Sequence, residues 1–316
     1  MSCGSTAQSP GARPLIRPFA SAIMAPVHPY VLYNGRITEA NEAILRPGQL
    51  GLLAGWGVFT TLRIYQGVPF AYERHWERMK RDAELLHVPF ELNREEVRRN
   101  LLALIDRNQS PEASMRVCVV RSEGGAWQGP GSGRAADLVA FSIDLHDWAD
   151  RVSLDVRKQG RHAASPFAGT KSLSWAHNLT MIETAQRNGF DEVILLNERG
   201  QIAECTSANI FAVVDGVTYT PPLSAGPLPG VTRAVMLREL DLADTPVQER
   251  TLLLEDLYEA EEVFITSSTR ELLPVERIRD RVLSQGPWPV MDKLRAGLRA
   301  YVERYVGEQR SAAAAE

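Results

Sequence analysis

The apolar residues of this chain change their spacing repeatedly, from the two-residue period of strands to the longer period of helices. Residues 31–33 form an apolar run that leads into Asn34-Gly35, a dipeptide typical of a tight β-hairpin turn. A second β-rich run covers residues 58–65. Over residues 72–86, by contrast, apolar side chains are spaced among charges as on an amphipathic helix. The first half of the chain therefore combines strands with helices.

A length of 316 residues exceeds what one hydrophobic core usually organises, so we expect two domains. The composition becomes polar at residues 144–157, where we place the boundary. The prediction is a small domain at residues 28–147, a connector at 148–157 and a larger domain at 158–316. Residues 1–27 are predicted to be a disordered extension, because Met24 lies just before the first strand-like segment. The first 36 residues contain no acidic side chain, as is typical of a targeting segment. An organelle-targeting segment is the alternative.

Local signals predict the remaining elements. Asn93, followed three residues later by Glu96, is a capping signature for a helix that runs through Ile105. Further strands are expected at residues 115–120, 138–143, 154–156, 192–196, 201–204 and 263–265, with a hairpin at Asp215-Gly216. Further helices are expected at residues 178–188, 232–240 and 291–305.

Composition and spacing exclude several classes of partner. The net charge is −4 and basic residues are interleaved with acidic ones, so nucleic acid is not an expected partner. No apolar run reaches the roughly 18 residues of a membrane span. The three cysteines lack C-x-x-C spacing and the six histidines lack H-E-x-x-H spacing, so we predict no bound metal. A reduced, cytoplasmic setting fits these cysteines.

One lysine is conspicuous in a chain whose basic residues are nearly all arginine. Only four lysines occur among the 35 basic residues, and Lys171 lies amid small and apolar residues at 165–173. A buried ammonium can lose its proton and then attack an aldehyde, whereas a guanidinium cannot. Composition alone still favours a loop lysine that is there by chance. The neighbouring motifs therefore decide whether Lys171 has a catalytic role.

Motifs before, around and after Lys171 resemble, in the same order, those of class IV aminotransferases and their relatives. They are residues 55–59, 75–79, 171–178, 191–196, 200–211, 219–222, 228–233 and 267–275. The resemblance covers about residues 30–305, which makes it far more specific than one isolated motif. It implies the α/β (α+β) architecture of two-domain pyridoxal-phosphate fold type IV, with a smaller N-terminal α/β domain and a larger C-terminal pseudo-barrel domain that carries the lysine. It also implies a homodimer.

The resemblance assigns roles to three charged residues. Lys171 is expected to hold pyridoxal 5'-phosphate as a Schiff base and to act as the catalytic base. Glu204 is expected to keep the pyridine nitrogen of the cofactor protonated. Arg78 is expected to bind the cofactor phosphate through its planar guanidinium. The alternatives are a solvated helix arginine for Arg78 and an outward-facing strand glutamate for Glu204.

Two further segments are expected to contact the cofactor phosphate. Gly230, Val231 and Thr232 begin a predicted helix, where free backbone N–H groups and the helix dipole favour an anion. Ser268 and Thr269 follow a predicted strand and would add hydroxyl donors.

Substrate contacts are expected from Phe59, Thr61, Arg121 and Trp175, which occupy substrate-facing positions of the family. Arg121 is the candidate partner of a substrate carboxylate, and Trp175 is expected to form a wall. Asn178, at the start of its predicted helix, is expected to be a cap.

Departures from the family patterns leave the reaction open. Branched-chain aminotransferases usually have a glutamate after the phenylalanine at position 59, where this chain has Thr60-Thr61, and an Asn-Tyr pair where it has Ser174-Trp175. The Arg and His of D-amino-acid aminotransferases are also missing after Arg121. We expect an aminotransferase that passes the amino group of an apolar, branched-chain L-amino acid to the keto acid 2-oxoglutarate. The alternatives are aminodeoxychorismate lyase, which residues 59–63 also resemble, and a non-enzymatic relative that binds the cofactor.

Overall fold

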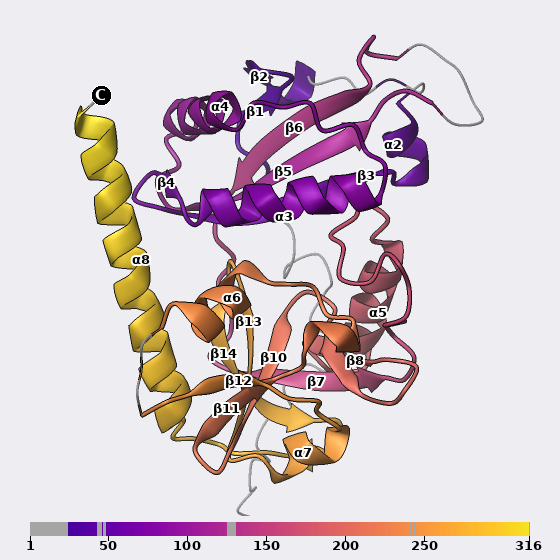
Figure 1. Cartoon of the computed structure of the whole chain (residues 1–316), viewed down its shortest axis with the longest axis vertical. Coiled ribbons are helices and arrows are strands. Elements are labelled where there is room, and N and C mark those ends of the chain that lie inside the picture. Colours follow the sequence, from indigo (N-terminus) through magenta and orange to yellow (C-terminus); the bar gives the residue numbers. More distant parts are fainter. Residues whose placement is uncertain are drawn as a thin grey trace, which may run out of the picture.

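Two lobes, each built around one β-sheet, meet along a seam near the middle of the molecule (Figure 1). The computed structural model describes residues 25–42, 46, 49–124, 131–240, 242 and 244–315. The predicted extension at residues 1–27 lies almost wholly outside the described residues, as does part of the loop that precedes Arg134.

The first lobe contains a six-stranded antiparallel sheet in the order β2-β1-β6-β5-β3-β4. Its strands are β1 (Tyr30–Tyr33), β2 (Arg36–Glu39), β3 (Gly57–Tyr65), β4 (Val68–Pro69), β5 (Ala113–Arg121) and β6 (Ala136–Ile143). The predicted hairpin joins β1 to β2, with Asn34 at φ 48° and Gly35 at φ 82°. Both positions have the positive φ that this two-residue turn requires.

Helices α3 (Tyr72–Leu85) and α4 (Arg94–Arg107) pack against this sheet, after the short η1 (Ala40–Glu42) and α2 (Leu50–Ala54). The Asn93 side chain accepts a hydrogen bond from the Glu96 N–H at 2.9 Å, as its capping signature predicts. Trp76 and Met79 of α3 join the core of the lobe. The same helix also buries His75, Arg78 and Asp82, and these polar side chains need partners.

The second lobe contains a mixed nine-stranded sheet, in the order β12-β11-β10-β13-β14-β7-β8-β9 with β15 paired to β14. Its strands are β7 (Val152–Arg157), β8 (Glu192–Leu196), β9 (Ile202–Cys205), β10 (Asn209–Val214), β11 (Val217–Thr220), β12 (Val247–Glu249), β13 (Glu262–Ser267), β14 (Glu271–Ile278) and β15 (Arg281–Val282). Its helices are α5 (Ala176–Arg187), η2 (Leu223–Ala225), α6 (Val231–Arg238), α7 (Leu254–Glu259) and α8 (Pro289–Ala315). Because β7 pairs with β8 and β14, the second sheet begins inside the predicted connector 148–157.

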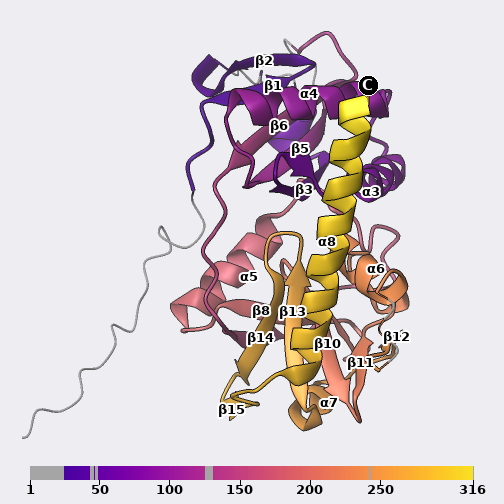
Figure 2. The ribbon, with the colours of Figure 1, turned by 90° about the vertical axis from the view of Figure 1, so that its left-hand side faces the viewer.

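Helix α8 runs beside both lobes, and Figures 1 and 2 show it from two directions. Phe70, between β4 and α3, makes edge contacts with Tyr301 and Tyr305 of α8, at centroid distances of 6.1 and 5.3 Å. The Tyr305 hydroxyl also donates to a Glu73 carboxylate oxygen at 2.7 Å. The helix is longer than the predicted 291–305, since the helix-forming residues continue to Ala315. One apolar cluster therefore contains residues of both lobes.

None of the helices in the described part of the chain combines the length and the apolar content that a membrane crossing requires.

Replacing Phe70 with Ala should destabilise the protein by about 3 kcal/mol, because it empties the shared apolar cluster. We expect a lowered midpoint of thermal unfolding in calorimetry. Leu223→Ala, at an exposed apolar side chain, is the control and should change the midpoint little. A Phe70→Ala midpoint equal to that of the control would contradict the role of this contact.

Candidate active site

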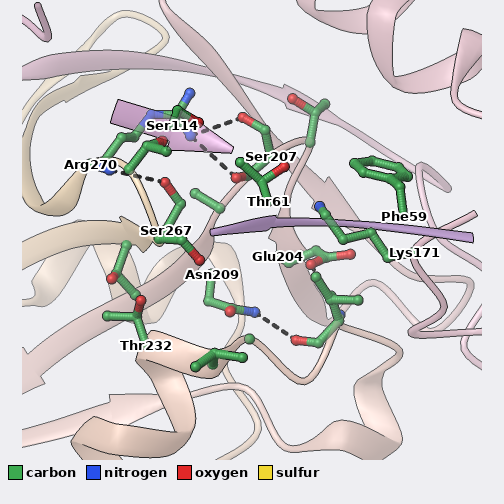
Figure 3. A pocket seen from close by; sticks show the side chains of 18 of the residues that line it. Phe59, Thr61, Ser114, Lys171, Glu204, Ser207, Asn209, Thr232, Ser267 and Arg270 are labelled. Carbon is green, nitrogen blue, oxygen red and sulfur yellow. Dashed lines mark hydrogen bonds between the residues drawn. The ribbon is translucent and has the colours of Figure 1, made fainter. Parts of the chain in front are cut away.

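A pocket at the seam collects nearly all of the residues that the sequence singles out (Figure 3). Those that line it are Phe59, Thr61, Arg78, Lys171, Trp175, Glu204, Gly230, Val231, Thr232, Ser268 and Thr269. They come from both lobes, and from segments as far apart in sequence as β3 and the turn between β13 and β14.

Arg121 is the exception. Its guanidinium lies 4.2 Å from the centroid of the Trp56 ring, and it donates to the carbonyl oxygens of Glu123 and His87. It is not among the residues that line the pocket. The side chain leaves the end of β5 and packs over Trp56, away from the residues that line the pocket, and its contact with substrate stays a prediction.

Lys171 lies at the centre of the pocket beside two aromatic rings. Its Nζ is 4.6 Å from the centroid of Phe59 and 5.9 Å from that of Trp175. Burial, followed by the nearby positive charges of Arg78 and Arg116, lowers the pKa of the amine to about 7. The neutral form of the Lys171 amine is therefore far more accessible near pH 7 than in a free lysine, and a neutral amine is the form that attacks an aldehyde.

Glu204 is buried on β9 and lines the same pocket. Its Oε1 accepts a hydrogen bond from Arg161 Nε at 2.9 Å, and its Oε2 accepts one from the Leu228 N–H at 3.0 Å. Each carboxylate oxygen can accept a second hydrogen bond. Glu204 is thus fixed in place and still able to face a protonated ring nitrogen.

Asn178 supports this arrangement and is not the helix cap that the sequence suggests. Helix α5 begins two residues earlier, after Trp175, and Asn178 is buried inside its first turn. The Asn178 amide donates to the Thr206 carbonyl at 2.6 Å and accepts from Arg161 at 3.4 Å. The prediction failed because these partners are distant in sequence.

Arg78 is held by a chain of buried polar groups. Its Nη2 donates to Thr60 Oγ1 at 2.8 Å, and Thr60 Oγ1 lies 2.7 Å from His75 Nδ1. Burial and the charges of Arg78 and Lys171 lower the pKa of His75, so the ring is neutral and its Nδ1 accepts a hydrogen bond from the Thr60 hydroxyl. Burial also lowers the pKa of Arg78, to about 10. Arg78 Nε is buried with no partner among the described residues.

The start of α6 offers free backbone donors beside Arg78. Gly230 is the N-cap residue and supplies no side-chain cap. A Cβ at Gly230 would overlap Asn209 Oδ1, so this close approach requires glycine. Asn209 in turn donates to the Leu228 carbonyl at 3.0 Å (Figure 3). The N–H groups at the start of α6 and the Thr232 hydroxyl are therefore positioned for an anion.

Four charged residues of this region escaped the sequence analysis, namely Asp82, Arg116, Arg161 and Arg270. Arg116 faces the pocket because it pairs across the sheet with Thr61, and its guanidinium is 4.6 Å from the Phe59 centroid. An arginine inside an otherwise apolar strand was the signal that could have identified it. Arg270 binds Ser207 Oγ at 2.9 Å and Glu192 at 3.4 Å, both far from it in sequence.

Three features define the class of this site: an amine of lowered pKa, a carboxylate across the pocket and an arginine beside the start of α6. Together they fit a cofactor that has an aldehyde, a basic ring nitrogen and a phosphate. The unpartnered Arg78 Nε and the uncapped start of α6 are the observations that favour a bound phosphate. Among the described residues, no cluster of His, Cys, Asp and Glu side chains could hold a metal ion.

Comparisons with known proteins agree with this class. The family model described as amino-transferase class IV matches residues 57–278. The chain is 30% identical over 259 residues to a Methanocaldococcus jannaschii protein assigned as a branched-chain-amino-acid aminotransferase, covering 80% of this chain and 89% of that protein. The chain belongs to the class IV aminotransferase family, and its cofactor is pyridoxal 5'-phosphate.

Two solved structures show the same fold. The branched-chain aminotransferase of the archaeon Thermoproteus uzoniensis, solved with norvaline, matches with a TM-score of 0.80 at 26% identity, over 89% of this chain and 98% of that chain. A Legionella pneumophila protein assigned as 4-amino-4-deoxychorismate lyase matches with a TM-score of 0.76 at 23% identity, over 83% of this chain and 96% of that chain. The fold is therefore fold type IV, as the sequence predicts.

Attachment of pyridoxal phosphate to the cofactor-free protein should depend on the neutral form of Lys171. Since the pKa is lowered to about 7, the attachment rate should rise about tenfold per pH unit below pH 7 and level off above it. Stopped-flow absorbance measures this profile. Borohydride reduction and peptide mapping should then place the label on Lys171. A label on Lys80, Lys158 or Lys293 would overturn the assignment.

Proposed function

We propose that this enzyme transfers the amino group of an apolar, branched-chain L-amino acid to 2-oxoglutarate, with Lys171 as its catalytic base. The proposal combines a family role with two properties of the pocket: its apolar lining and the partly buried Arg116, which lies over the Phe59 ring. It also draws on the relatives from Methanocaldococcus jannaschii and Thermoproteus uzoniensis, whose names specify branched-chain amino acids.

The apolar wall consists of Phe59, Trp175, Leu179 and Ile182. The rings of Phe59 and Trp175 meet edge to face at a centroid distance of 6.1 Å beside the Lys171 amine. An aliphatic side chain placed against this wall would leave water and bury apolar surface, at about 25 cal/mol per Å². This surface favours an apolar amino donor.

Arg116 is the observation that supports a dicarboxylate as the amino acceptor. Its side chain lines the pocket from β5, and burial lowers its pKa. Among the described residues its guanidinium has no ion-pair partner, in contrast to Arg161, which pairs with Glu204. A partly buried arginine without an anion is disfavoured, and a substrate carboxylate would supply one. 2-Oxoglutarate carries a second carboxylate that an apolar amino acid lacks.

The roles of the protein side chains follow from their positions. When bound, the cofactor supplies an aldehyde for the substrate amine and a protonated ring that accepts electrons from the substrate Cα. Lys171 Nζ takes the proton from the substrate Cα and later returns one. Glu204, fixed by Arg161 and Leu228, holds the proton on the ring nitrogen. Arg78 and the start of α6 hold the phosphate, together with Ser268 and Thr269.

We also propose that the enzyme is a cytoplasmic homodimer. The family resemblance supports the dimer, and the free thiols of Cys118 and Cys205 are consistent with a reducing compartment. We further propose that residues 28–147 and 158–316 form the two domains.

Aminodeoxychorismate lyase remains the second candidate. The Thr60-Thr61 pair after Phe59 supports it, and so does the Legionella pneumophila protein as a structural neighbour. The lyase eliminates pyruvate from its substrate and ends each cycle with its original cofactor form.

Replacing Arg116 with Gln should raise the KM for 2-oxoglutarate about 10- to 100-fold, because a charge-assisted hydrogen bond to its second carboxylate is lost. The KM for L-leucine should change much less. Steady-state kinetics with each substrate varied measures both constants. The control is Arg99→Gln, at an exposed arginine of α4. Equal changes for the two substrates would refute the role of Arg116.

The reaction class can be tested in a single half reaction without a keto acid. L-Leucine or L-glutamate alone should bleach the visible absorbance of the holoenzyme, because an aminotransferase leaves the amino group on the cofactor. Added 2-oxoglutarate should restore the band. If L-amino acids, D-alanine and simple amines all leave the spectrum unchanged while aminodeoxychorismate releases pyruvate, the enzyme is the lyase.

A further inference from the structure

Asp82 is a buried carboxylate to which neither the family resemblance nor the proposed reaction gives a role. It lies on α3, one helical turn after Arg78, with 0% of its surface exposed. A fully buried carboxylate is rare and is tolerated only when hydrogen bonds and positive charges surround it. Its partners therefore indicate what it does.

One oxygen of Asp82 binds the backbone of the reactive lysine. Its Oδ2 accepts a hydrogen bond from the Lys171 N–H at 3.0 Å, although the two residues are 89 positions apart. The Lys171 carbonyl oxygen accepts one from the Phe59 N–H on β3 at 3.0 Å. The peptide groups on both sides of the Lys171 Cα are thus tied to elements of the first lobe.

The other oxygen of Asp82 pairs with Arg81, and Arg81 extends the connection. Arg81 Nε donates to Asp82 Oδ1 at 3.0 Å, and Arg81 Nη2 donates to the Gly169 carbonyl at 2.9 Å. Gly169 has a φ of 72°, and a Cβ there would lie 2.8 Å from the Pro227 carbonyl oxygen. The segment 169–171 is therefore held in one conformation against α3.

Asp82 also supplies a negative charge close to the positive charges of Lys171 and Arg78. The charged side chains that influence the Lys171 amine are Arg78 and Asp82 of α3, Arg116 of β5 and Glu204 of β9. His75 of α3 lies beside Arg78, and Arg81 of α3 is paired with Asp82. Asp82 and Glu204 are the two anions of this group, and both favour the protonated lysine. Asp82 favours the charged form of Arg78 as well.

We propose that Asp82 is a positioning residue for the reactive lysine: its carboxylate fixes the backbone at Lys171 and offsets the positive charge of Arg78 beside the lysine amine. This inference rests on the proposed role of Lys171. It predicts that loss of the Asp82 charge changes the protonation of the attached lysine nitrogen, which a purely structural aspartate would not do.

The experiment uses the holoenzyme and the variant Asp82→Asn, which keeps the shape and one acceptor oxygen but removes the charge. The visible absorbance of the bound cofactor is titrated with pH. Because an anion near the nitrogen is lost, the midpoint should fall by about one pH unit. Asp106→Asn, at an exposed aspartate of α4, is the matched control and should leave the midpoint unchanged. Thermal unfolding of all variants is recorded in parallel.

A fall of at least about half a pH unit, beyond the control, supports the inference. A smaller change, or a rise, overturns it, even if Asp82→Asn lowers the unfolding temperature. If Asp82→Asn does not fold, Asp82→Ser, which also removes the charge, is judged by the same criterion. Borohydride mapping of the wild-type holoenzyme separates the two hypotheses: a label away from Lys171 refutes the proposed function, whereas a label on Lys171 with an unchanged midpoint refutes only the role of Asp82.

Discussion

The charge balance around the Lys171 amine is the interaction on which the site depends. Burial lowers the pKa of this lysine to about 7, and Arg78 and Arg116 act in the same direction. Glu204 and Asp82 are the anions that oppose these effects on Lys171, so in a pocket without them nothing would offset the charges of Arg78 and Arg116 at the amine. Such a pocket would strongly disfavour the arginines as well, because an uncompensated buried charge costs several kcal/mol. The two carboxylates therefore stabilise the burial of this lysine together with Arg78.

This balance exists only while the lobes keep their relative position. Asp82, Arg78 and Arg116 come from the first lobe, whereas Lys171 and Glu204 belong to segments of the second. Polar contacts cross the seam close to the pocket, such as the 2.9 Å bond from Arg81 to the Gly169 carbonyl. Farther away, α8 and the apolar cluster around Phe70 hold the lobes on the side of the molecule that Figure 2 shows. The chemistry of one lysine thus depends on packing distributed along the whole seam.

The sequence predicted those features whose signals are local. Asn34-Gly35 and Asn93 act through neighbours within three residues, so the hairpin and the helix start lie where the sequence places them. Lys171 and Glu204 were found through ordered motifs, and the structure brings both to one pocket. Asn178 was interpreted wrongly, since its partners Arg161 and Thr206 come from other segments. Asp82 was missed for the same reason, because its contact with Lys171 spans 89 positions.

From the sequence, the Thr60-Thr61 pair does not distinguish an aminotransferase from a lyase. The structure shows that the two threonines lie on opposite faces of β3. Successive side chains of a strand point to opposite faces of the sheet, so the two threonines cannot share a role. Thr60 faces α3 and binds Arg78 and His75, next to the phosphate site that we propose. Thr61 lines the pocket and pairs across the sheet with Arg116. The departure from the branched-chain pattern therefore bears on the substrate only through Thr61, whose neighbour is the arginine that we assign to the acceptor carboxylate.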